Sequence, residues 1–289
     1  RSKLAEAFTL RSATVIDESV SADETRKLLL EFPDGARVET VLIHGRNRRT
    51  VCVSTQVGCA MGCVFCASGL EGLGRNLTAG EILEQVLRFH SPETPVTNVV
   101  FMGSGEPLAN YDATLQAIRA LVDPEQLDLS ARKITLSTVG LVEGIRRLAL
   151  EDIPLTLAIS LHAPNDELRR ELLPTAASTC TIEELLDAAN EFYEARHREI
   201  TLEYTLLDGV NDSNFHADQL ANLAHSVRCN VNLLAYNVVE GLDFQRPNEV
   251  RFQAFAAHLT HRGVNVNIRN SRGESSDAAC GQLRRRQDQ

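Results

Sequence analysis

Three cysteines lie close together in one short stretch of the chain, Cys59, Cys63 and Cys66, with the spacing C-x3-C-x2-C. The stretch directly follows a segment that we expect to be a strand, and its small residues predict a loop. Three thiolates on one loop can bind three irons of a cubane cluster, whereas iron–sulfur clusters usually take four cysteine ligands. If no fourth protein ligand exists, one iron stays open for a substrate. The spacing therefore indicates a metal centre with an open coordination position.

Two other interpretations of this loop stay open at this point. One is a zinc site, although zinc loops favour C-x2-C pairs and need a fourth ligand at a fitting distance. The other is a set of buried structural cysteines, which the tight spacing makes a poor explanation. The remaining cysteines, Cys52, Cys180, Cys229 and Cys280, bring the total to seven. An odd number in a long chain does not suit a secreted disulfide scaffold and favours the reducing cytoplasm.

The loop lies in a regular alternation of strand-like and helical segments. We expect strands over 51–55, 98–102, 133–137, 155–161, 200–206, 230–234 and 264–268, and helices over 79–90, 113–121, 142–150, 182–196, 215–225 and 249–261. Thr78 and Thr181 are expected N-caps, the second with Glu184 in a capping box, and Gly263 is expected to end the last helix. Such alternation predicts an α/β fold with a parallel sheet covered by helices. Six or seven units suit a partial or complete barrel, whose chemistry lies at the carboxyl ends of the strands.

The first 44 residues precede this alternation. Segments 26–32 and 37–43 are strand-like, and Pro33-Asp34-Gly35 between them is a turn pattern, so the sequence predicts a β-hairpin. We therefore expect three parts: an N-terminal extension with the hairpin over 1–44, a core barrel over 45–276 and a C-terminal segment over 277–289.

The composition limits the class of protein. The chain has 289 residues, of which 43% are hydrophobic and 24% charged, as in ordinary globular proteins. No apolar run approaches the ~20 residues that cross a bilayer, so we expect no membrane span. The net charge of −10 argues against a general polyanion binder. Local basic groups such as Arg48 and Arg49 still leave room for an RNA contact.

Longer motifs carry a resemblance to a known family. A C-x3-C-x2-C loop after the first strand of a β/α barrel is similar to the radical S-adenosylmethionine (SAM) superfamily. Five further stretches keep their order along the chain: VETV at 38–41, CVSTQVGC at 52–59, MGSGEPL at 102–108, SLHAPN at 160–165 and DAACGQL at 277–283. With them the chain resembles the radical SAM RNA adenine methyltransferases of the RlmN/Cfr family, closest to the dual-specificity members that methylate adenine C2.

The resemblance implies the fold, the cofactors and the partners. It implies a partial (β/α)6-type radical SAM barrel with one 4Fe-4S cluster on Cys59, Cys63 and Cys66, and two SAM molecules per turnover. An electron from the cluster, supplied by a donor such as flavodoxin, cleaves one SAM to a 5′-deoxyadenosyl radical. The implied substrate is RNA, namely 23S rRNA with tRNA as a further candidate. A monomer in the cytoplasm, with no membrane contact, is the expected form.

The resemblance also implies roles for single residues. Cys280 matches the cysteine that takes a methyl group from SAM and then links it to the adenine. Cys52 matches the cysteine that resolves this adduct through a transient disulfide with Cys280. Glu39 matches the proton acceptor. The implied SAM-binding residues are Gly105, Glu106, Ser137, Ser160, Leu161, His162 and Asn237. Taken singly, Ser137 could instead cap a helix, and His162 could be a structural histidine.

Two alternative functions stay open. The same mechanism could methylate adenine C8 of 23S rRNA, as in the antibiotic-resistance type. A non-catalytic metal-cluster module that binds RNA is the second alternative, and Cys280 speaks against it because a binding module needs no second, remote cysteine. Family members usually carry an N-terminal helical domain before the barrel. Only about 40 residues precede the barrel here, so we expect that domain to be short, divergent or absent.

Overall fold

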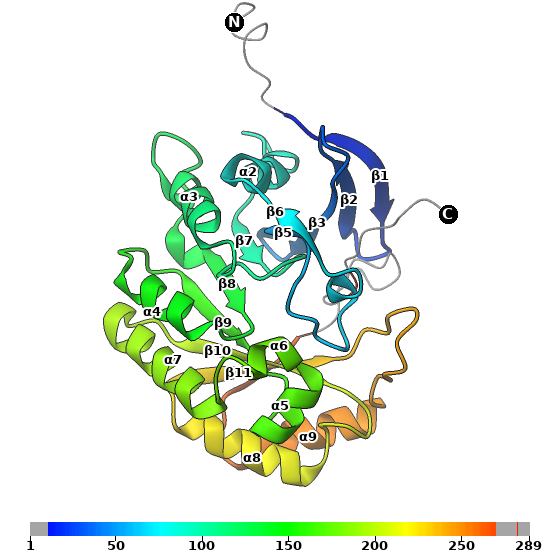
Figure 1. The fold of residues 1–289 in the computed structure, drawn as a ribbon, viewed down its shortest axis with the longest axis vertical. Helices are drawn as coiled ribbons and strands as arrows, with labels where there is room; N and C mark the ends of the chain where they lie inside the picture. Colours follow the sequence, from blue (N-terminus) through cyan, green and yellow to red (C-terminus); the bar gives the residue numbers. More distant parts are fainter. Residues whose placement is uncertain (1–10, 270–281, 283–289) are drawn as a thin grey trace, which may run out of the picture.

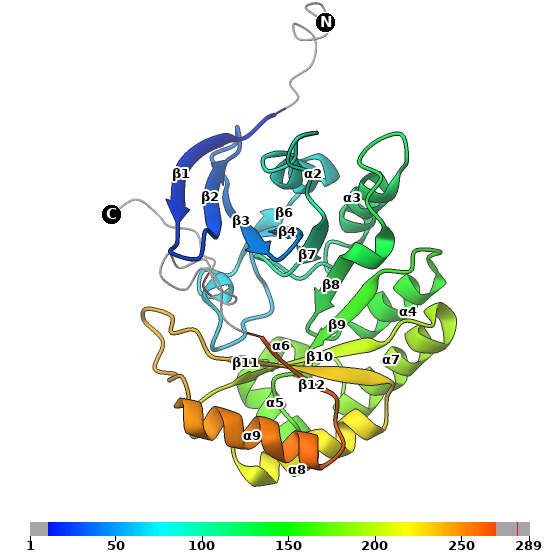
Figure 2. The same ribbon diagram turned by 180° about the vertical axis from the view of Figure 1, so that it is seen from behind.

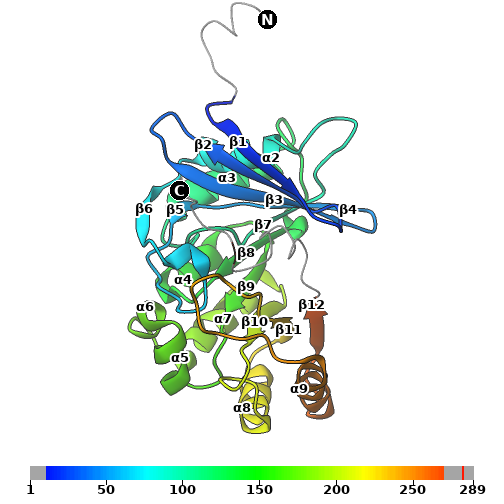
Figure 3. The same ribbon diagram turned by 90° about the vertical axis from the view of Figure 1, so that its right-hand side faces the viewer.

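The computed structural model describes residues 11–269 and Gln282. Its main feature is a ten-stranded sheet with the strand order β1-β2-β3-β4-β7-β8-β9-β10-β11-β12, accompanied by a small ribbon of β5 and β6 (Figure 1). Figure 3 shows β1–β4 at one end of the sheet and β12 at the other. Because β1 and β12 are separate edges, the strands form an open, partial barrel, which confirms the predicted fold class.

The element bounds follow the predicted alternation closely. The strands of the large sheet are β1 (Thr14–Val20), β2 (Arg26–Glu31), β3 (Arg37–Gly45), β4 (Arg48–Cys52), β7 (Asn98–Phe101), β8 (Ile134–Thr138), β9 (Thr156–Ser160), β10 (Ile200–Leu206), β11 (Cys229–Ala235) and β12 (Val266–Arg269). The ribbon strands are β5 (Gln56–Gly58) and β6 (Leu73–Asn76). The helices are α2 (Ala79–Leu87), α3 (Tyr111–Val122), α4 (Val142–Leu150), α5 (Asp166–Leu172), α6 (Pro174–Ala177), α7 (Ile182–Arg196), α8 (Asn214–His225) and α9 (Glu249–His261), with single 3-10 turns at Ala67–Gly69 and Ala131–Lys133.

The strands from β4 onward run parallel, from β4 through β7, β8, β9, β10 and β11 to β12. Helices connect successive strands and lie around the outside of the curved sheet (Figure 2). Buried aliphatic and aromatic residues of both layers form one continuous core between sheet and helices. Since parallel strands end on the same side, the loops that follow them meet at one edge of the barrel.

Local sequence signals account for where several helices begin and end. Thr78 and Thr181 both form complete capping boxes, with Glu81 and Glu184 respectively. Gly263 follows α9 with φ +80°, and its N–H donates to Thr260 O at 2.9 Å. The three predicted helix boundaries are therefore confirmed, and the physical reason is the one expected: unpaired backbone groups at helix ends take local partners.

The predicted N-terminal hairpin is confirmed, since β2 and β3 pair antiparallel around the turn at Gly35, which has φ +80°. One further strand, β1, pairs with β2 and was missed because most of its side chains are exposed and give no apolar pattern. The hairpin also joins the barrel sheet directly, because β3 pairs with β4. Strand β4 ends at Cys52, three residues before the end of the strand predicted over 51–55.

Three short features near the barrel opening were also not predicted: the β5–β6 ribbon and the helices α5 and α6. Helix α6 spans four residues, too few for a periodic pattern to appear in the sequence. No helix within the described part of the chain is long and apolar enough to cross a membrane.

Candidate active site

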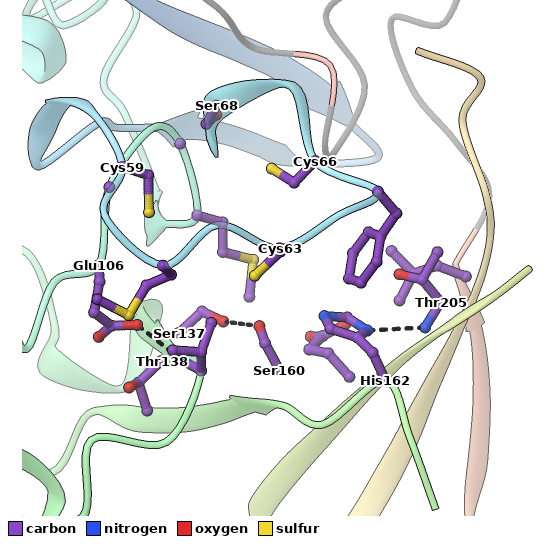
Figure 4. Close-up of a pocket in the computed structure, with 18 of the residues that line it drawn as sticks. Cys59, Cys63, Cys66, Ser68, Glu106, Ser137, Thr138, Ser160, His162 and Thr205 are labelled. Carbon is purple, nitrogen blue, oxygen red and sulfur yellow. Dashed lines mark hydrogen bonds between the residues drawn. The ribbon is translucent and has the colours of Figure 1, made fainter. Parts of the chain in front are cut away.

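A cavity opens at the carboxyl ends of the parallel strands (Figure 4). It gathers side chains from loops that are far apart in the sequence, as expected for a barrel. The sequence-predicted residues that line it are Cys59, Cys63, Cys66, Gly105, Glu106, Ser137, Ser160 and His162. The structure therefore brings together all three cysteines of the motif and five of the seven expected SAM-binding positions.

The cysteine loop lies between the ribbon strand β5 and the 3-10 turn at Ala67–Gly69. Residues of α5 and α6 pack against it. Val64 N donates to Leu172 O at 3.1 Å, and Phe65 packs into a small buried cluster with Leu172, Leu173 and Ala176. Cys66 N donates to Cys63 O at 3.1 Å, which closes a tight turn inside the loop. The unpredicted helices thus give the loop a fixed support.

Burial has a strong effect on the three thiols. It raises the pKa of Cys59 from 9.0 to about 11, and it also raises the pKa of Cys63 and Cys66. Thiolates in this place therefore need a positive partner to compensate for lost hydration. Among the described residues, no three His, Cys, Asp or Glu groups could hold a single metal ion. The three cysteines line one cavity together, and three cysteine ligands are the set that the sequence analysis assigned to an iron–sulfur cluster with one open iron.

Glu106, in the loop after β7, lies near the cysteine loop, since its charge contributes to the raised pKa of Cys59 and Cys63. Its two carboxylate oxygens accept hydrogen bonds from Leu108 N at 2.9 Å and from Val139 N at 2.8 Å, and its own N–H donates to Gln56 Oε1 at 2.9 Å. Burial raises the pKa of Glu106 from 4.5 to about 7, against the lowering effect of the two backbone donors. The carboxylate is thus fixed in place and ready to bind a cation.

The chain reaches Glu106 through Gly105, whose backbone has φ +103°. A Cβ atom at Gly105 would lie 2.6 Å from Gln56 Cβ and 2.8 Å from Gln56 N. Only glycine fits both the left-handed conformation and this close approach to β5. The GSGEP motif therefore needs a glycine here for structural reasons, in addition to any contact with a ligand.

The ends of β8 and β9 contribute a pair of hydroxyls. Ser137 Oγ and Ser160 Oγ lie 3.1 Å apart on the cavity wall (Figure 4). The N-cap position of the next helix, α4, is Leu141, and Thr138 Oγ1 accepts from Gly140 N at 3.0 Å. Ser137 is therefore not the helix cap that it could have been, and its hydroxyl is directed to the site.

The His162 side chain lies just beyond β9 and is held by a backbone hydrogen bond. Its Nδ1 accepts a hydrogen bond from Thr205 N at 3.1 Å, which leaves the proton on Nε2. Burial, with a smaller contribution from the nearby charge of Arg169, lowers its pKa to about 3. Asn211 Nδ2 donates to His162 O at 2.9 Å and stabilises its backbone at φ +52°. The ring is both structurally satisfied and part of the cavity wall.

Two expected SAM-binding residues do not line the cavity. Leu161 is fully buried in the main core, and its position between Ser160 and His162 explains why. Asn237 is also buried, two residues beyond the end of β11. Any contact of Leu161 with SAM would have to come from its backbone.

Glu39 and Cys52 do not line the cavity; they lie on β3 and β4, in the part of the sheet that adjoins β7. Cys52 is buried in a small cluster with Val41, and Met102 packs against this cluster. Met102 also lines the cavity, so this side chain contacts both the cluster of Cys52 and the cavity. Glu39, on the neighbouring strand β3, is 4% exposed and forms an ion pair with Lys27 of β2. Cys280 lies outside the described residues, while Gln282 is buried and donates to Val238 O at 2.9 Å.

The structure adds cavity residues that the sequence reasoning missed. Glu203 on β10 lines the cavity, is 5% exposed and accepts from Asn232 Nδ2 at 3.0 Å. Arg269 at the end of β12 lies 3.4 Å from the same Glu203 oxygen. A charged residue in the middle of the apolar segment 200–206 was the available signal for Glu203. Arg269 gave none, because it lies at the end of the short strand β12 and belongs to no motif.

Comparison with known proteins agrees with this geometry. Residues 53–219 match the model of the radical SAM superfamily. The chain is 47% identical to a probable dual-specificity RNA methyltransferase RlmN of Rhodopirellula baltica, over 99% of this chain and 77% of that protein. The chain belongs to the RlmN family of radical SAM methyltransferases.

One further relative and one solved structure support the same assignment. The ribosomal RNA large subunit methyltransferase N of Nitrosopumilus maritimus is 45% identical, over 96% of this chain and 82% of that protein. The crystal structure of a radical SAM methyltransferase from Sphaerobacter thermophilus superposes with a TM-score of 0.94 at 45% identity, over 98% of this chain and 84% of that one. As a member of the RlmN family the chain is an enzyme, a SAM-dependent methyltransferase of the radical type. The interpretation as a non-catalytic module is therefore wrong.

Membership of this superfamily implies an iron–sulfur cluster and SAM. The residues present fit both groups. Three partly buried thiols with raised pKa values need a positive partner, which the irons of a cluster would provide, and Glu106 lines the same cavity, where it could meet a ligand ammonium group. The same cavity thus carries residues suited to the cluster and to SAM.

Proposed function

We propose that the protein methylates C2 of an adenine in RNA, with 23S rRNA as the main substrate and tRNA as a second one. The observation that carries the proposal is the cavity itself: three loop thiols, Glu106 and the Ser137–Ser160 pair converge in one place in a chain of the RlmN family. The relatives, which are named as dual-specificity and ribosomal RNA methyltransferases, support an RNA substrate.

In this proposal the described residues divide the work. Cys59, Cys63 and Cys66 hold the 4Fe-4S cluster, and Glu106 binds the SAM ammonium group. The paired hydroxyls and His162 Nε2–H offer hydrogen bonds to the rest of the SAM molecule. When bound, the cluster supplies the electron that cleaves SAM to a radical. The neutral state of His162 suits this role, because an uncharged ring does not repel the sulfonium group.

The cysteine chemistry of the proposal lies in Cys280 and Cys52. Cys280 accepts a methyl group from one SAM, so two SAM molecules are used per turnover. Cys280 then forms a covalent link to the base, and Cys52 resolves it through a transient disulfide. Glu39 accepts the proton that leaves the adenine carbon. Covalent catalysis of this kind divides one difficult substitution into several easier steps.

The proposal extends to the setting of the enzyme. We take the N-terminal extension as residues 1–44, the core as 45–276 and the C-terminal segment as 277–289. A flavodoxin-type protein supplies the electron, and the enzyme acts as a cytoplasmic monomer. The exposed Arg48, the first residue of β4, is a candidate phosphate contact.

Mass spectrometry of cellular RNA tests the proposal. RNA from cells with the gene should contain 2-methyladenosine at one position of 23S rRNA and in tRNA, and RNA from cells lacking it should not. Finding 8-methyladenosine instead would replace the C2 assignment by the C8 alternative. Unchanged RNA in the deletion strain would remove RNA as the substrate.

Replacing Glu106 by Gln should weaken SAM binding by about 10- to 100-fold, because a hydrogen bond to a charged partner contributes about 1.5–3 kcal/mol. The wild-type carboxyl has a pKa of about 7, so it is neutral at lower pH and ionised at higher pH. SAM affinity should therefore rise as the pH increases through 7, and Glu106→Gln should remove this dependence. Calorimetric titration of the reconstituted protein measures both effects.

Glu143→Gln, whose side chain is 87% exposed on α4, is the matched control. An unchanged affinity and pH profile in Glu106→Gln would exclude this residue as a SAM ligand.

A further inference from the structure

Lys27 and Glu39 form an ion pair that is almost completely buried. Lys27 Nζ lies 2.8 Å from Glu39 Oε1, and the two side chains are 7% and 4% exposed. On the same hairpin, Arg26 and Glu18 form a pair that is 44% and 40% exposed. Removing two charges from water is costly, and apolar replacements of such pairs often leave stability unchanged or raise it. Stability alone therefore gives little reason for the buried pair.

The pair lies on the inner side of the sheet. The neighbouring residues Leu28, Val38 and Leu42 belong to the main core between the sheet and the helices. Since successive side chains of a strand point to opposite faces, Lys27 and Glu39 face away from the helices. The N-terminal hairpin thus carries a charged pair on the concave side of the partial barrel.

This inner face is continuous with the site. Val41 is the partner of Lys27 in the register of β2 and β3, so their side chains share a face. Val41 packs with Cys52, and Met102 packs against both. Met102 lines the cavity of the cysteine loop. A path of direct contacts therefore leads from the strand of Glu39 through Cys52 to the cavity.

We propose that Lys27 is a positioning residue that keeps Glu39 ionised and fixed as the proton acceptor of RNA methylation. This inference rests on the proposed function, in which a C–H bond of the adenine breaks and its proton forms an O–H bond with the Glu39 carboxylate. The bonding electron pair stays on the base. An adjacent ammonium group favours the charged carboxylate before this step and prevents its early protonation. The hairpin then supplies part of the catalytic apparatus and is more than an edge of the sheet.

Other titratable groups on this face of the sheet can also influence the pH profile. Glu31 and Arg37 pair with each other at 2.7 Å across β2 and β3, Asp17 lies on β1, and the Cys52 thiol is on β4. All of these groups remain in a variant of Lys27. A change in the pH profile of such a variant therefore reports the loss of the ammonium group.

The test compares Lys27→Met with Lys27→Arg in the full, cluster-reconstituted enzyme, and Arg26→Met is the control from the exposed pair. Single-turnover methylation of an RNA transcript is measured as a function of pH. Lys27→Met should slow methylation at neutral pH by about tenfold or more, and the acid limb of the profile should move to higher pH by about 1 to 3 pH units. Lys27→Arg should restore most of the rate, and Arg26→Met should behave as wild type. Cleavage of SAM in the absence of RNA should stay unchanged in all three.

A second measurement separates this inference from the proposed function. Isotope-edited infrared titration, with Glu39→Gln subtracted, follows the Glu39 carboxyl directly. Its protonation should move to higher pH in Lys27→Met, or in Lys27→Gln where the Met variant does not fold. Wild-type enzyme that fails to methylate RNA would refute the proposed function, and the infrared titration would still decide the inference. A wild-type methylation profile, or an unchanged infrared titration, in a folded Lys27 variant would overturn the role of Lys27.

Discussion

Enzyme in which any one of Cys59, Cys63 or Cys66 is replaced by Ala should lose SAM cleavage completely. Each thiol lines the cavity, and the loop from 59 to 66 carries no further cysteine that could take its place. The variants should also lose the brown absorbance of the reconstituted cluster, because the two remaining thiols leave one further iron without its ligand. Production of 5′-deoxyadenosine, measured by chromatography after anaerobic reduction, gives the rate.

The matched control is Cys229→Ala. Cys229 begins β11 at the opposite end of the strands, and its Sγ donates to Ala224 O at 3.4 Å. This variant should keep both the absorbance and the cleavage rate. If one of the three loop variants produced 5′-deoxyadenosine at the wild-type rate, the ligand assignment would be wrong.

Replacing Cys52 by Ala should trap the enzyme on its RNA. If Cys52 resolves the covalent adduct, its loss leaves the base attached through Cys280. Denaturing gels should show a shifted protein band that nuclease returns to its normal position. The variant should still fold, since Cys52 lies in a small apolar cluster in which the alanine side chain is also apolar.

Two double variants sharpen this test. Cys52→Ala with Cys280→Ala should give no shifted band, because the attachment point is missing. Cys52→Ala with Cys63→Ala should give none either, because no radical forms. A Cys52→Ala enzyme that turns over with free protein and fully methylated RNA would remove Cys52 from the mechanism.

The sequence predicted the frame of the molecule well, for clear physical reasons. Long amphipathic segments such as 182–196 have a strong period, and capping residues such as Thr181 mark their ends, so α7 was predicted to the residue. Short elements give no such pattern. Helix α6 has four residues, and its value lies in its tertiary contact with the cysteine loop. Strand β1 is stabilised by backbone pairing with β2, which leaves no mark on its exposed side chains.

The candidate site likewise contains residues that the sequence predicted and residues that it did not. Motif residues such as Glu106 and Ser160 could be carried over because the resemblance is long and ordered. Residues with no motif, such as Arg269, reach the cavity only through the curvature of the sheet. The ion pair of Lys27 and Glu39 depends on strand register, because the two residues are 12 positions apart and meet only when β2 and β3 pair. A single sequence does not fix that register to the residue.

The most direct test of the account follows a labelled methyl group. The enzyme is incubated with SAM that carries a labelled methyl group, without RNA, and the peptide containing Cys280 is examined by mass spectrometry. The account predicts one labelled methyl group on Cys280, followed by its transfer to adenine when RNA, unlabelled SAM and reductant are added. Active enzyme whose Cys280 stays unmodified, while the label passes directly from SAM to RNA, would contradict the proposed mechanism.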